Sequence, residues 1–503
     1  FKDLNPVLDF FFPGFTLANN MSVDGYYQTI NGKPDFRFEG FTPFFAYNDL
    51  SIYNLGISVS SDSISLITDI TGDSIATSGG LAIENPDIQA IFAENKNTIN
   101  LQWSNDSAVR YSGDIGTSGQ LLYPGRPQPG YKLQIIPSEL YFKNRKFSIP
   151  NSFITVDSSG IAIDSFLIRG MDQYILAHGK YSDHIGDSLI LDAHNLNMHM
   201  INDISKDFIM DIGGMLTGDM NFYKQEGKLM LTTDLIAENL TINSEPIGTT
   251  RITADWKRSG KQLDIRATSM GETSNRIFID GSYLPRSGKL DFDLKLDKIN
   301  LPLIRPYMSG ILDDISGTSD FDLSLDGTIK QPVLNGTIAF NNARLTLSET
   351  KTRYTFSDNL RIYKNDIYFD NFEIRDQYNN ILHTNGNIAT ANFKNIYLNL
   401  DLDATNFNFL ATRRSDNEQF YGDIFASATA KINGPPDKLK VAAFATTEKY
   451  TSLKLPLYNS SEITSSDFVT FISREEDDVS PEKVEYIKKN KLTLDMELNV
   501  ENN

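Results

Sequence analysis

The sequence predicts an all-β protein built from a long antiparallel sheet, and three features of its 503 residues predict this fold. Runs in which apolar and polar residues alternate occur from one end of the chain to the other. A short phrase recurs about every 105 residues, with its asparagine at Asn195, Asn300 and Asn406. Patterns typical of helices are few and short, so parallel strands joined by helical crossovers are not expected.

The recurring phrase begins with aspartate and has an asparagine three positions later, at Asp192–Met198, Asp297–Leu303 and Asp403–Phe409. Long β-units that repeat in this way stack along one axis, because a single unit cannot bury its own apolar face. We expect the aspartates to cap turns that the asparagines close through side-chain hydrogen bonds. A glycine precedes each copy (Gly179, Gly281, Gly386) and another follows it (Gly218, Gly317, Gly422).

Alternation of apolar and polar residues places one set of side chains on each face of a strand. It is clearest in Leu290–Leu296, Phe321–Leu325, Ile396–Leu402 and Leu492–Leu498. Between such runs lie Asp-Gly and Asn-Gly pairs, which are typical of hairpin turns. The sequence therefore predicts a meander of antiparallel strands. The pairs are Asp24-Gly25, Asn31-Gly32, Asp280-Gly281, Asp326-Gly327, Asn335-Gly336, Asn385-Gly386 and Asn433-Gly434.

Four segments are candidates for short helices: residues 197–207, 301–309, 407–414 and 465–473. The first three directly follow the repeated phrase, and Ser465 is the expected N-cap of the fourth. The charged residues 474–490 are expected to form a mobile connector, and an ordinary solvated connector fits them equally well. The segment 110–131 is rich in Gly, Ser and Pro, which predicts a long loop.

Composition excludes several classes of function. A net charge of −19 without a Lys/Arg stripe argues against nucleic acid as a partner. The absence of cysteine excludes disulfides, thiol catalysis and thiolate-bound metals. No nucleophile elbow, phosphate loop or zinc signature is present, so we expect no enzyme activity, no cofactor and no metal. The five histidines are scattered and match no ligand spacing: His178, His184, His194, His199 and His383.

Residues 316–457 carry a family resemblance. The segment Gly317–Phe340, with Pro332 and Gly336, resembles the glycine- and proline-marked repeat of the AsmA-like family. Residues 417–422 and 432–436, and then Leu455–Leu457 before Asp467–Ile472, resemble the C-terminal module of the TamB family, in the form found in Bacteroidetes. The resemblance covers about residues 130–503 well and 1–130 loosely. The family pattern differs from this sequence in two respects. TamB-like chains continue in a further glycine-rich strand segment, and they begin with an inner-membrane anchor.

The resemblance implies an elongated antiparallel β-taco, in which a sheet curls into an apolar groove. It implies three regions: a less regular groove segment at 1–130, repeated units of about 100 residues at 131–460, and a short helix, acidic linker and terminal strand at 461–503. It also implies a periplasmic, bridge-like protein that carries phospholipid between the inner and outer membranes. The implied partners are phospholipid acyl chains and an outer-membrane BamA-family barrel, TamA or TamL-like, and the inner-membrane anchor is expected outside this fragment.

The apolar sets of the alternating strands are the candidate lipid-groove residues, because acyl chains gain about 0.8 kcal/mol per methylene on leaving water. Alternation alone fits a sealed sandwich core equally well, and the resemblance favours the open groove. A scaffold for outer-membrane β-strands without lipid conduction is a second possible function, and a β-helix adhesin or carbohydrate-active protein is a third. The candidates are Leu290, Phe292, Leu294, Leu296, Phe321, Leu323, Leu325, Ile338, Phe340, Leu345, Leu347, Ile396, Leu398, Leu400 and Leu402.

Overall fold

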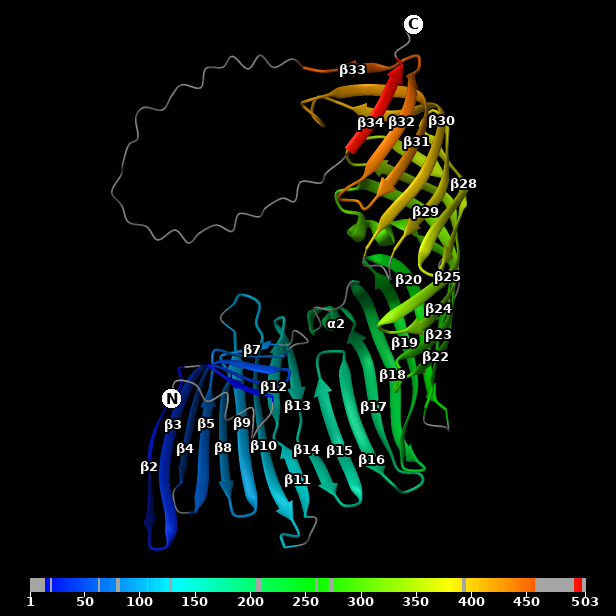
Figure 1. Ribbon diagram of the computed structural model, residues 1–503. Helices are drawn as coiled ribbons and strands as arrows, with labels where there is room; N and C mark the ends of the chain where they lie inside the picture. Colours follow the sequence, from blue (N-terminus) through cyan, green and yellow to red (C-terminus); the bar gives the residue numbers. More distant parts are fainter. Residues whose placement is uncertain are drawn as a thin grey trace, which may run out of the picture. The chain divides into compact units, whose positions relative to one another are not determined.

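The computed structural model describes residues 14–18, 20–61, 64–77, 82–105, 107–125, 129–204, 210–257, 261–270, 276–390, 395–456 and 493–499 (Figure 1). The chain divides into two units, unit 1 (Phe1–Phe292) and unit 2 (Asp293–Asn503). Each unit is built on a β-sheet, and the strand β23 (Lys289–Asn300) contains the boundary between them. The predicted fold class, an all-β curled sheet, is confirmed.

Among the residues that the structure describes, unit 1 contains the strands up to β22 and one short helix, α2 (His199–Ile204). The strands are β1 (Phe15–Leu17), β2 (Ser22–Ile30), β3 (Lys33–Tyr47), β4 (Leu50–Ser61), β5 (Ser65–Thr71), β6 (Ser74–Thr77), β7 (Ala82–Glu84), β8 (Asp87–Ala93), β9 (Lys96–Ser104), β10 (Ser112–Leu122), β11 (Gly130–Ile135), β12 (Ser138–Phe142), β13 (Arg145–Ile149), β14 (Ser152–Asp157), β15 (Gly160–Arg169), β16 (Tyr174–Ser182), β17 (Ser188–Asn197), β18 (Ile212–Gln225), β19 (Lys228–Ile242), β20 (Glu245–Trp256), β21 (Leu263–Met270) and β22 (Arg276–Leu284).

Unit 2 contains the 3₁₀ helix η1 (Leu301–Met308) and the later strands. They are β24 (Leu312–Thr328), β25 (Gln331–Leu347), β26 (Arg353–Phe356), β27 (Asn359–Tyr363), β28 (Asp366–Asp376), β29 (Ile381–Ala389), β30 (Tyr397–Thr412), β31 (Tyr421–Gly434), β32 (Lys440–Thr447), β33 (Ser452–Lys454) and β34 (Thr493–Asn499).

Most strands that follow one another in the chain are also neighbours in the sheet, as the sequence predicts. In unit 1 the antiparallel run β14 to β22 pairs each strand with the next. In unit 2, β24 and β25 form a hairpin of two 17-residue strands, and β28 to β32 continue the meander (Figure 1). The one parallel pair among the described strands is β32–β34. Antiparallel pairing excludes a β-helix, whose coils stack in parallel.

Most of the Asp-Gly and Asn-Gly pairs lie inside strands, so their prediction as turns was wrong except at Asn31-Gly32. Gly386 shows the physical reason, because a Cβ at this position of β29 would lie 2.1 Å from the carbonyl oxygen of Asn399 on β30. Only glycine permits this approach together with its φ of +119°. The tight turns with positive φ at two central residues are instead at 31–32, 143–144, 226–227, 243–244 and 364–365.

The repeated phrase marks β-bulges rather than turns, so the expectation of turn caps was also wrong. The register of β17 shifts between Ala193 and Leu196, and that of β30 shifts between Ala404 and Phe407. The extra residue in each shift adopts positive φ, at Asn195 and Asn406. Its backbone N–H donates to a side-chain hydroxyl of the next strand, Thr217 or Ser427, at 3.0 Å. Bulges of this kind bend a strand and increase its twist.

In the second copy of the phrase the residue with positive φ is Lys298, whose N–H donates to the Asp320 carboxylate at 2.6 Å. Asn300 itself ends β23 and precedes η1 without a side-chain cap. The three copies therefore share one backbone feature. In each, the N–H of a strand residue with positive φ donates to a side-chain oxygen on the neighbouring strand.

Two of the predicted helices are present, at α2 and at η1. The helix predicted at 407–414 was wrong, because these residues mainly continue β30. The bulge explains the error, since it places Ala404 and Phe407 three residues apart on one face, which mimics helical spacing. The predicted helix at 465–473 and connector at 474–490 lie outside the described residues.

The loop predicted at 110–131 was wrong as well, because β10 occupies Ser112–Leu122. Its glycines lie beside large side chains of the neighbouring strands. A Cβ at Gly113 would meet the Trp103 ring at 2.1 Å, and one at Gly119 would meet the Tyr131 hydroxyl at 1.7 Å. Glycine in this strand therefore makes room for cross-strand aromatic residues.

Candidate functional site

One face of the sheet in unit 2 carries a continuous set of apolar side chains. Residues that are directly opposite in register share a face of the sheet. Following these pairs from β24 to β31 gives the first row, Leu323–Gly336–Ile362–Ile367–Ile388–Leu398–Gly434. A second row, from β28 to β32, is Phe369–Gly386–Leu400–Ile432–Val441. We call this surface the apolar face of unit 2.

The opposite face of the same strands is polar. Asn399 of β30 lies opposite Asn387 and Asn433, and Asp401 lies opposite Asn385 and Lys431. The Lys431 ammonium is 3.5 Å from the Asp401 carboxylate, and both side chains are exposed. Such an exposed ion pair adds little stability. Along this part of β30, successive residues place apolar side chains on one face of the sheet and polar side chains on the other.

The apolar face is the inner side of a curl. Tyr354 on β26 stacks on Phe407 of β30, with ring centroids 5.1 Å apart. The strands β28 and β29 lie between them in the sheet, so in a flat sheet the two positions would be about 14 Å apart. The Tyr354 hydroxyl also donates to the Asn408 carbonyl at 3.1 Å. The sheet of unit 2 therefore bends toward its apolar face until two distant strands touch.

Where the curl closes, the inner side is filled by protein. Tyr354, Leu382, Ala404 and Phe407 form a buried cluster, and Phe407 is 0 % exposed. Burial raises the pKa of Tyr354 to about 12 from its ordinary value of 10.0, and the nearby Asp376 carboxylate adds to this rise. The phenol therefore stays neutral in the fold throughout the physiological pH range.

The helix η1 covers a second part of the apolar face. Leu301 of η1 packs with Ile315 of β24 and Ala343 of β25 in a buried cluster. Pro302 follows directly after the first residue of this helix, where the missing N–H of proline costs no hydrogen bond. The pattern of the sequence did not indicate that this part of the face is covered.

Of the fifteen candidate groove residues, all except Ile396 lie on strands, and the fifteen differ in how far they are buried. Leu323 is buried (8 % exposed), and Ile396, which directly precedes β30, is exposed (47 %). Four of the others, Phe340, Leu345, Leu347 and Leu402, pack against the two buried clusters. The rest are partly exposed on their strands: Leu290, Phe292, Leu294, Leu296, Phe321, Leu325, Ile338, Leu398 and Leu400.

On β23 the alternation is complete. Leu290, Phe292, Leu294 and Leu296 are half-buried, whereas Asp291, Asp293 and Lys295 between them are exposed. Leu290 and Phe292 belong to unit 1, and Leu294 and Leu296 belong to unit 2.

Unit 1 has an apolar face of its own, which the sequence pattern did not reveal. Register pairs give one row from β3 to β10, Gly40–Ile57–Ile70–Ile88–Leu101–Ile115. A second row, from β11 to β19, is Leu133–Ile154–Ile163–Gly179–Leu189–Phe222–Leu231. The signal was present as short alternating runs, but bulges interrupt the period of two, as between Ile163 and Phe166.

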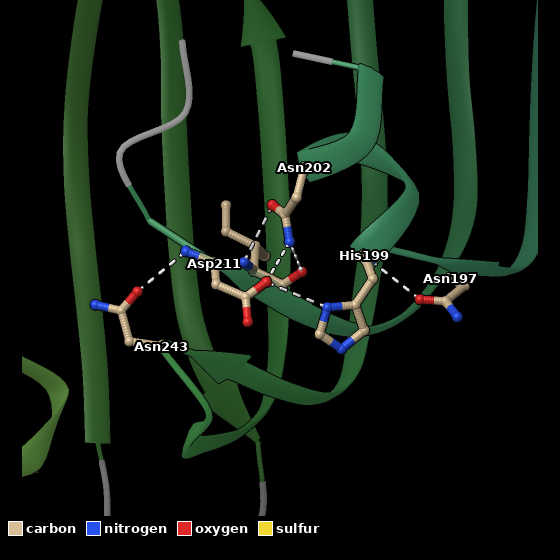
Figure 2. A network of polar contacts seen from close by, with 6 residues as sticks. Asn197, His199, Asn202, Asp211 and Asn243 are labelled. Carbon is tan, nitrogen blue, oxygen red and sulfur yellow. Dashed lines mark hydrogen bonds and ion pairs between the residues drawn. The ribbon is translucent and has the colours of Figure 1, made fainter. Parts of the chain in front are cut away.

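The histidines make structural contacts rather than a ligand cluster. His199 of α2 lies beside Asp211 (Figure 2), and its Nδ1 is 3.3 Å from the Asp211 carboxylate. Asn202 contacts Asp211 and donates to the Ile212 carbonyl at 3.0 Å. Asn243 accepts from the Asp211 N–H at 3.0 Å (Figure 2), so the network joins α2 to strands β18 and β19. His178 lies 3.0 Å from Asp192.

Within the described ranges, no group of three or more His, Cys, Asp or Glu side chains is arranged to hold a metal ion. None of the helices in that part of the chain has the length and apolarity needed to cross a membrane.

Comparison with known proteins agrees with the C-terminal part of this fold. A family model described as the TamB C-terminal domain matches residues 370–503, from β28 onward. No curated protein and no solved structure matches the chain. The TamB family is linked to outer-membrane assembly and lipid transport and belongs to the cell envelope. Residues 370–503 are therefore similar to the C-terminal domain of the TamB family, and this match together with the curled antiparallel sheet supports a TamB-like protein.

Proposed function

We propose that this chain is a periplasmic, bridge-like protein whose apolar faces carry phospholipid acyl chains between the inner and outer membranes. In the full-length protein we place an anchor in the inner membrane, outside these residues. We also propose that it works with an outer-membrane barrel of the BamA family, TamA or TamL-like, in the assembly of outer-membrane proteins. The protein acts by binding and guiding its cargo, without catalysis.

The observation that carries this proposal is the continuous apolar row on the inner side of unit 2. A sealed core would bury the whole of this face. Leu323 and Ile362 are buried, but Leu398 and Leu400 stay partly exposed, as does Phe321 on the same face. Apolar surface exposed over many adjacent strands is a liability for a protein unless something apolar covers it. Acyl chains suit this role because they need no polar partner.

The energy scale is sufficient for binding. Burial gains about 0.8 kcal/mol per methylene, so a tail of about fourteen methylenes gains on the order of 10 kcal/mol when fully covered. Partial coverage on an open face gives roughly half of this gain, which allows a tail to move along the face from row to row. A cargo that must enter and leave is better served by this intermediate affinity than by a closed pocket.

The direct experiment is mass spectrometry of organic extracts from the purified protein, followed by transfer of a fluorescent phospholipid between donor and acceptor vesicles. We expect co-purified phospholipid and protein-dependent transfer. Phe321→Arg should reduce transfer strongly, because it places a charge on the apolar face. Asp322→Arg, at the next residue and on the other face, should not. Transfer that is equal in both variants contradicts the proposal.

A further inference from the structure

A cavity with aromatic and charged lining lies in unit 1, at the ends of neighbouring hairpins. It has a volume of about 1150 Å³ and is lined by the ends of β18 and β20 and by the turns beside them. The apolar face of unit 1 runs up to this cavity, since Phe222 lies opposite Leu231 and Trp256 lies opposite Leu263. The cavity therefore joins an apolar surface to a polar margin.

Trp256 lines the cavity from the apolar side of β20. It shares this side with Ile252 and Ala254, which precede it by four and two residues. Its indole Nε1–H is buried and has no acceptor among the described residues. A buried donor left without a partner costs about 1–3 kcal/mol, which an acceptor oxygen on a bound molecule would recover.

Lys224 brings a positive charge to the same margin. It lies two residues after Phe222 on β18 and so shares the apolar side of that strand. Its ammonium is 3.0 Å from the Asp183 carboxylate and 5.1 Å from the centre of the Tyr181 ring. A second lysine of the lining, Lys257, is 2.9 Å from Asp264. Lysine beside aromatic rings at the end of an apolar surface is the arrangement that anchors proteins at lipid headgroups.

The charged side chains that line the cavity indicate which class of lipid headgroup fits it. Lys224 and Lys257 are opposed by three carboxylates, Asp183, Glu226 and Asp255. A headgroup with net negative charge would meet these carboxylates and the overall charge of −19. A headgroup that carries both a phosphate and an ammonium group can satisfy lysines and carboxylates together.

We propose that this cavity binds the headgroup of a zwitterionic aminophospholipid. Lys224 and the Trp256 N–H contact the phosphate and ester oxygens, Asp183 and Glu226 contact the ammonium, and the acyl chains lie along the apolar face from Phe222 and Leu231. This inference rests on the proposed function, and it adds a headgroup preference and a place where cargo is held.

The chain has only two tryptophans, so Trp103→Phe leaves Trp256 as the single fluorescent reporter of the cavity. The test titrates this variant with phosphatidylethanolamine, phosphatidylglycerol and diacylglycerol of identical acyl chains, while mass spectrometry counts the bound lipid. We expect Trp256 emission to shift with phosphatidylethanolamine, at an affinity at least about tenfold above those of the other two lipids. Adding Lys224→Ala should remove this preference, since a charge-assisted hydrogen bond contributes about a factor of ten or more.

Two further variants complete the design. Lys431→Ala, which also removes a lysine paired with an aspartate, lies on the polar face of unit 2 and should leave the preference unchanged. Trp256→Phe replaces the indole with a smaller aromatic ring that has no N–H, and in competition experiments it should bind phosphatidylethanolamine several-fold more weakly without a change for diacylglycerol. Circular dichroism checks the fold of each variant.

The results of these experiments distinguish failure of the headgroup site from failure of the proposed lipid-binding function. Equal affinity for all three lipids, a preference for phosphatidylglycerol, or bound lipid without a change in Trp256 emission would overturn the headgroup site and leave lipid binding intact. Loss of lipid in every measurement, including mass spectrometry of the unmodified protein, would overturn the proposed function together with this site.

Discussion

Tyr354 and Phe407 stack across the inner side of unit 2, although two strands of the sheet lie between them. This contact makes the sheet a curl, because side chains of non-neighbouring strands meet only on the concave side. It also closes one part of the inner side with protein. Leu398 and Leu400 remain partly exposed, as do their cross-strand neighbours Ile388 and Ile432, whereas Leu323 and Ile362 of the first row are buried.

Phe407→Ala should destabilise unit 2 by about 3–5 kcal/mol, because it opens a cavity in a fully buried cluster. The measurement is the free energy of unfolding from urea denaturation of the purified chain. Phe444→Ala is the matched control, since that ring is 64 % exposed on β32, and its change should stay within about 0.5 kcal/mol. A small effect of Phe407→Ala would show that the curl does not depend on this contact.

Alkaline pH should weaken the fold through Tyr354. In the unfolded chain its phenol ionises near its ordinary pKa of 10.0, and in the fold burial raises the pKa to about 12. The unfolded state therefore loses this proton first as pH rises. The contribution of the neutral phenol to the free energy of unfolding is complete below pH 10. It falls by about 2–3 kcal/mol between pH 10 and 12.

The check on this prediction compares the unmodified chain with Tyr354→Phe at about pH 9 and about pH 12. The other tyrosines titrate equally in both proteins, so the difference isolates residue 354. The unmodified chain should lose about 2–3 kcal/mol more than the variant over this range. At neutral pH the variant should be about 1 kcal/mol less stable, because the Asn408 carbonyl loses its hydrogen bond. Identical pH dependence of the two proteins would contradict the burial of this phenol.

Gly386→Ala should destabilise unit 2 strongly, by about 2 kcal/mol or more, because its Cβ would clash with the β30 backbone at a positive φ. Gly116→Ala provides the comparison. A Cβ there has its nearest neighbour at 3.6 Å, an ordinary contact, and the change should be within about 1 kcal/mol. Thermal unfolding followed by circular dichroism measures both variants. Equal melting temperatures would show that close approach of the strands does not require glycine at position 386.

Local alternation made much of this fold predictable. The runs at Leu290–Leu296 and Phe321–Leu325 are strands with one apolar side, and the meander follows from the scarcity of crossover helices. The repeated glycines and the Asp-x-x-Asn phrase mark equivalent positions in the repeats. The sequence pattern does not show which local structure they form. A bulge at Asn406 and a close approach at Gly386 depend on the neighbouring strand, which single-strand patterns do not contain.

The candidate site was predictable to a similar degree. The period of two identifies which residues of one strand share a face, and for β23 and β30 it did so. It does not identify which side is concave, because the contact between Tyr354 and Phe407 joins residues that are 53 positions apart. The cover that η1 provides and the rows in unit 1 were missed for the same reason, since both depend on tertiary packing and on register across bulges.

If the exposed part of the apolar face holds acyl chains, a charge on that face should expel them, and two adjacent residues of β30 allow a matched comparison. Leu398→Asp places a carboxylate on the apolar face, whereas Asn399→Asp places the same group on the polar face one residue away. The measurement is the molar ratio of phospholipid to protein in organic extracts of each purified variant. We expect a ratio near the unmodified value for Asn399→Asp and a severalfold lower ratio for Leu398→Asp. Equal ratios for the two variants, with both proteins folded, would contradict the proposal.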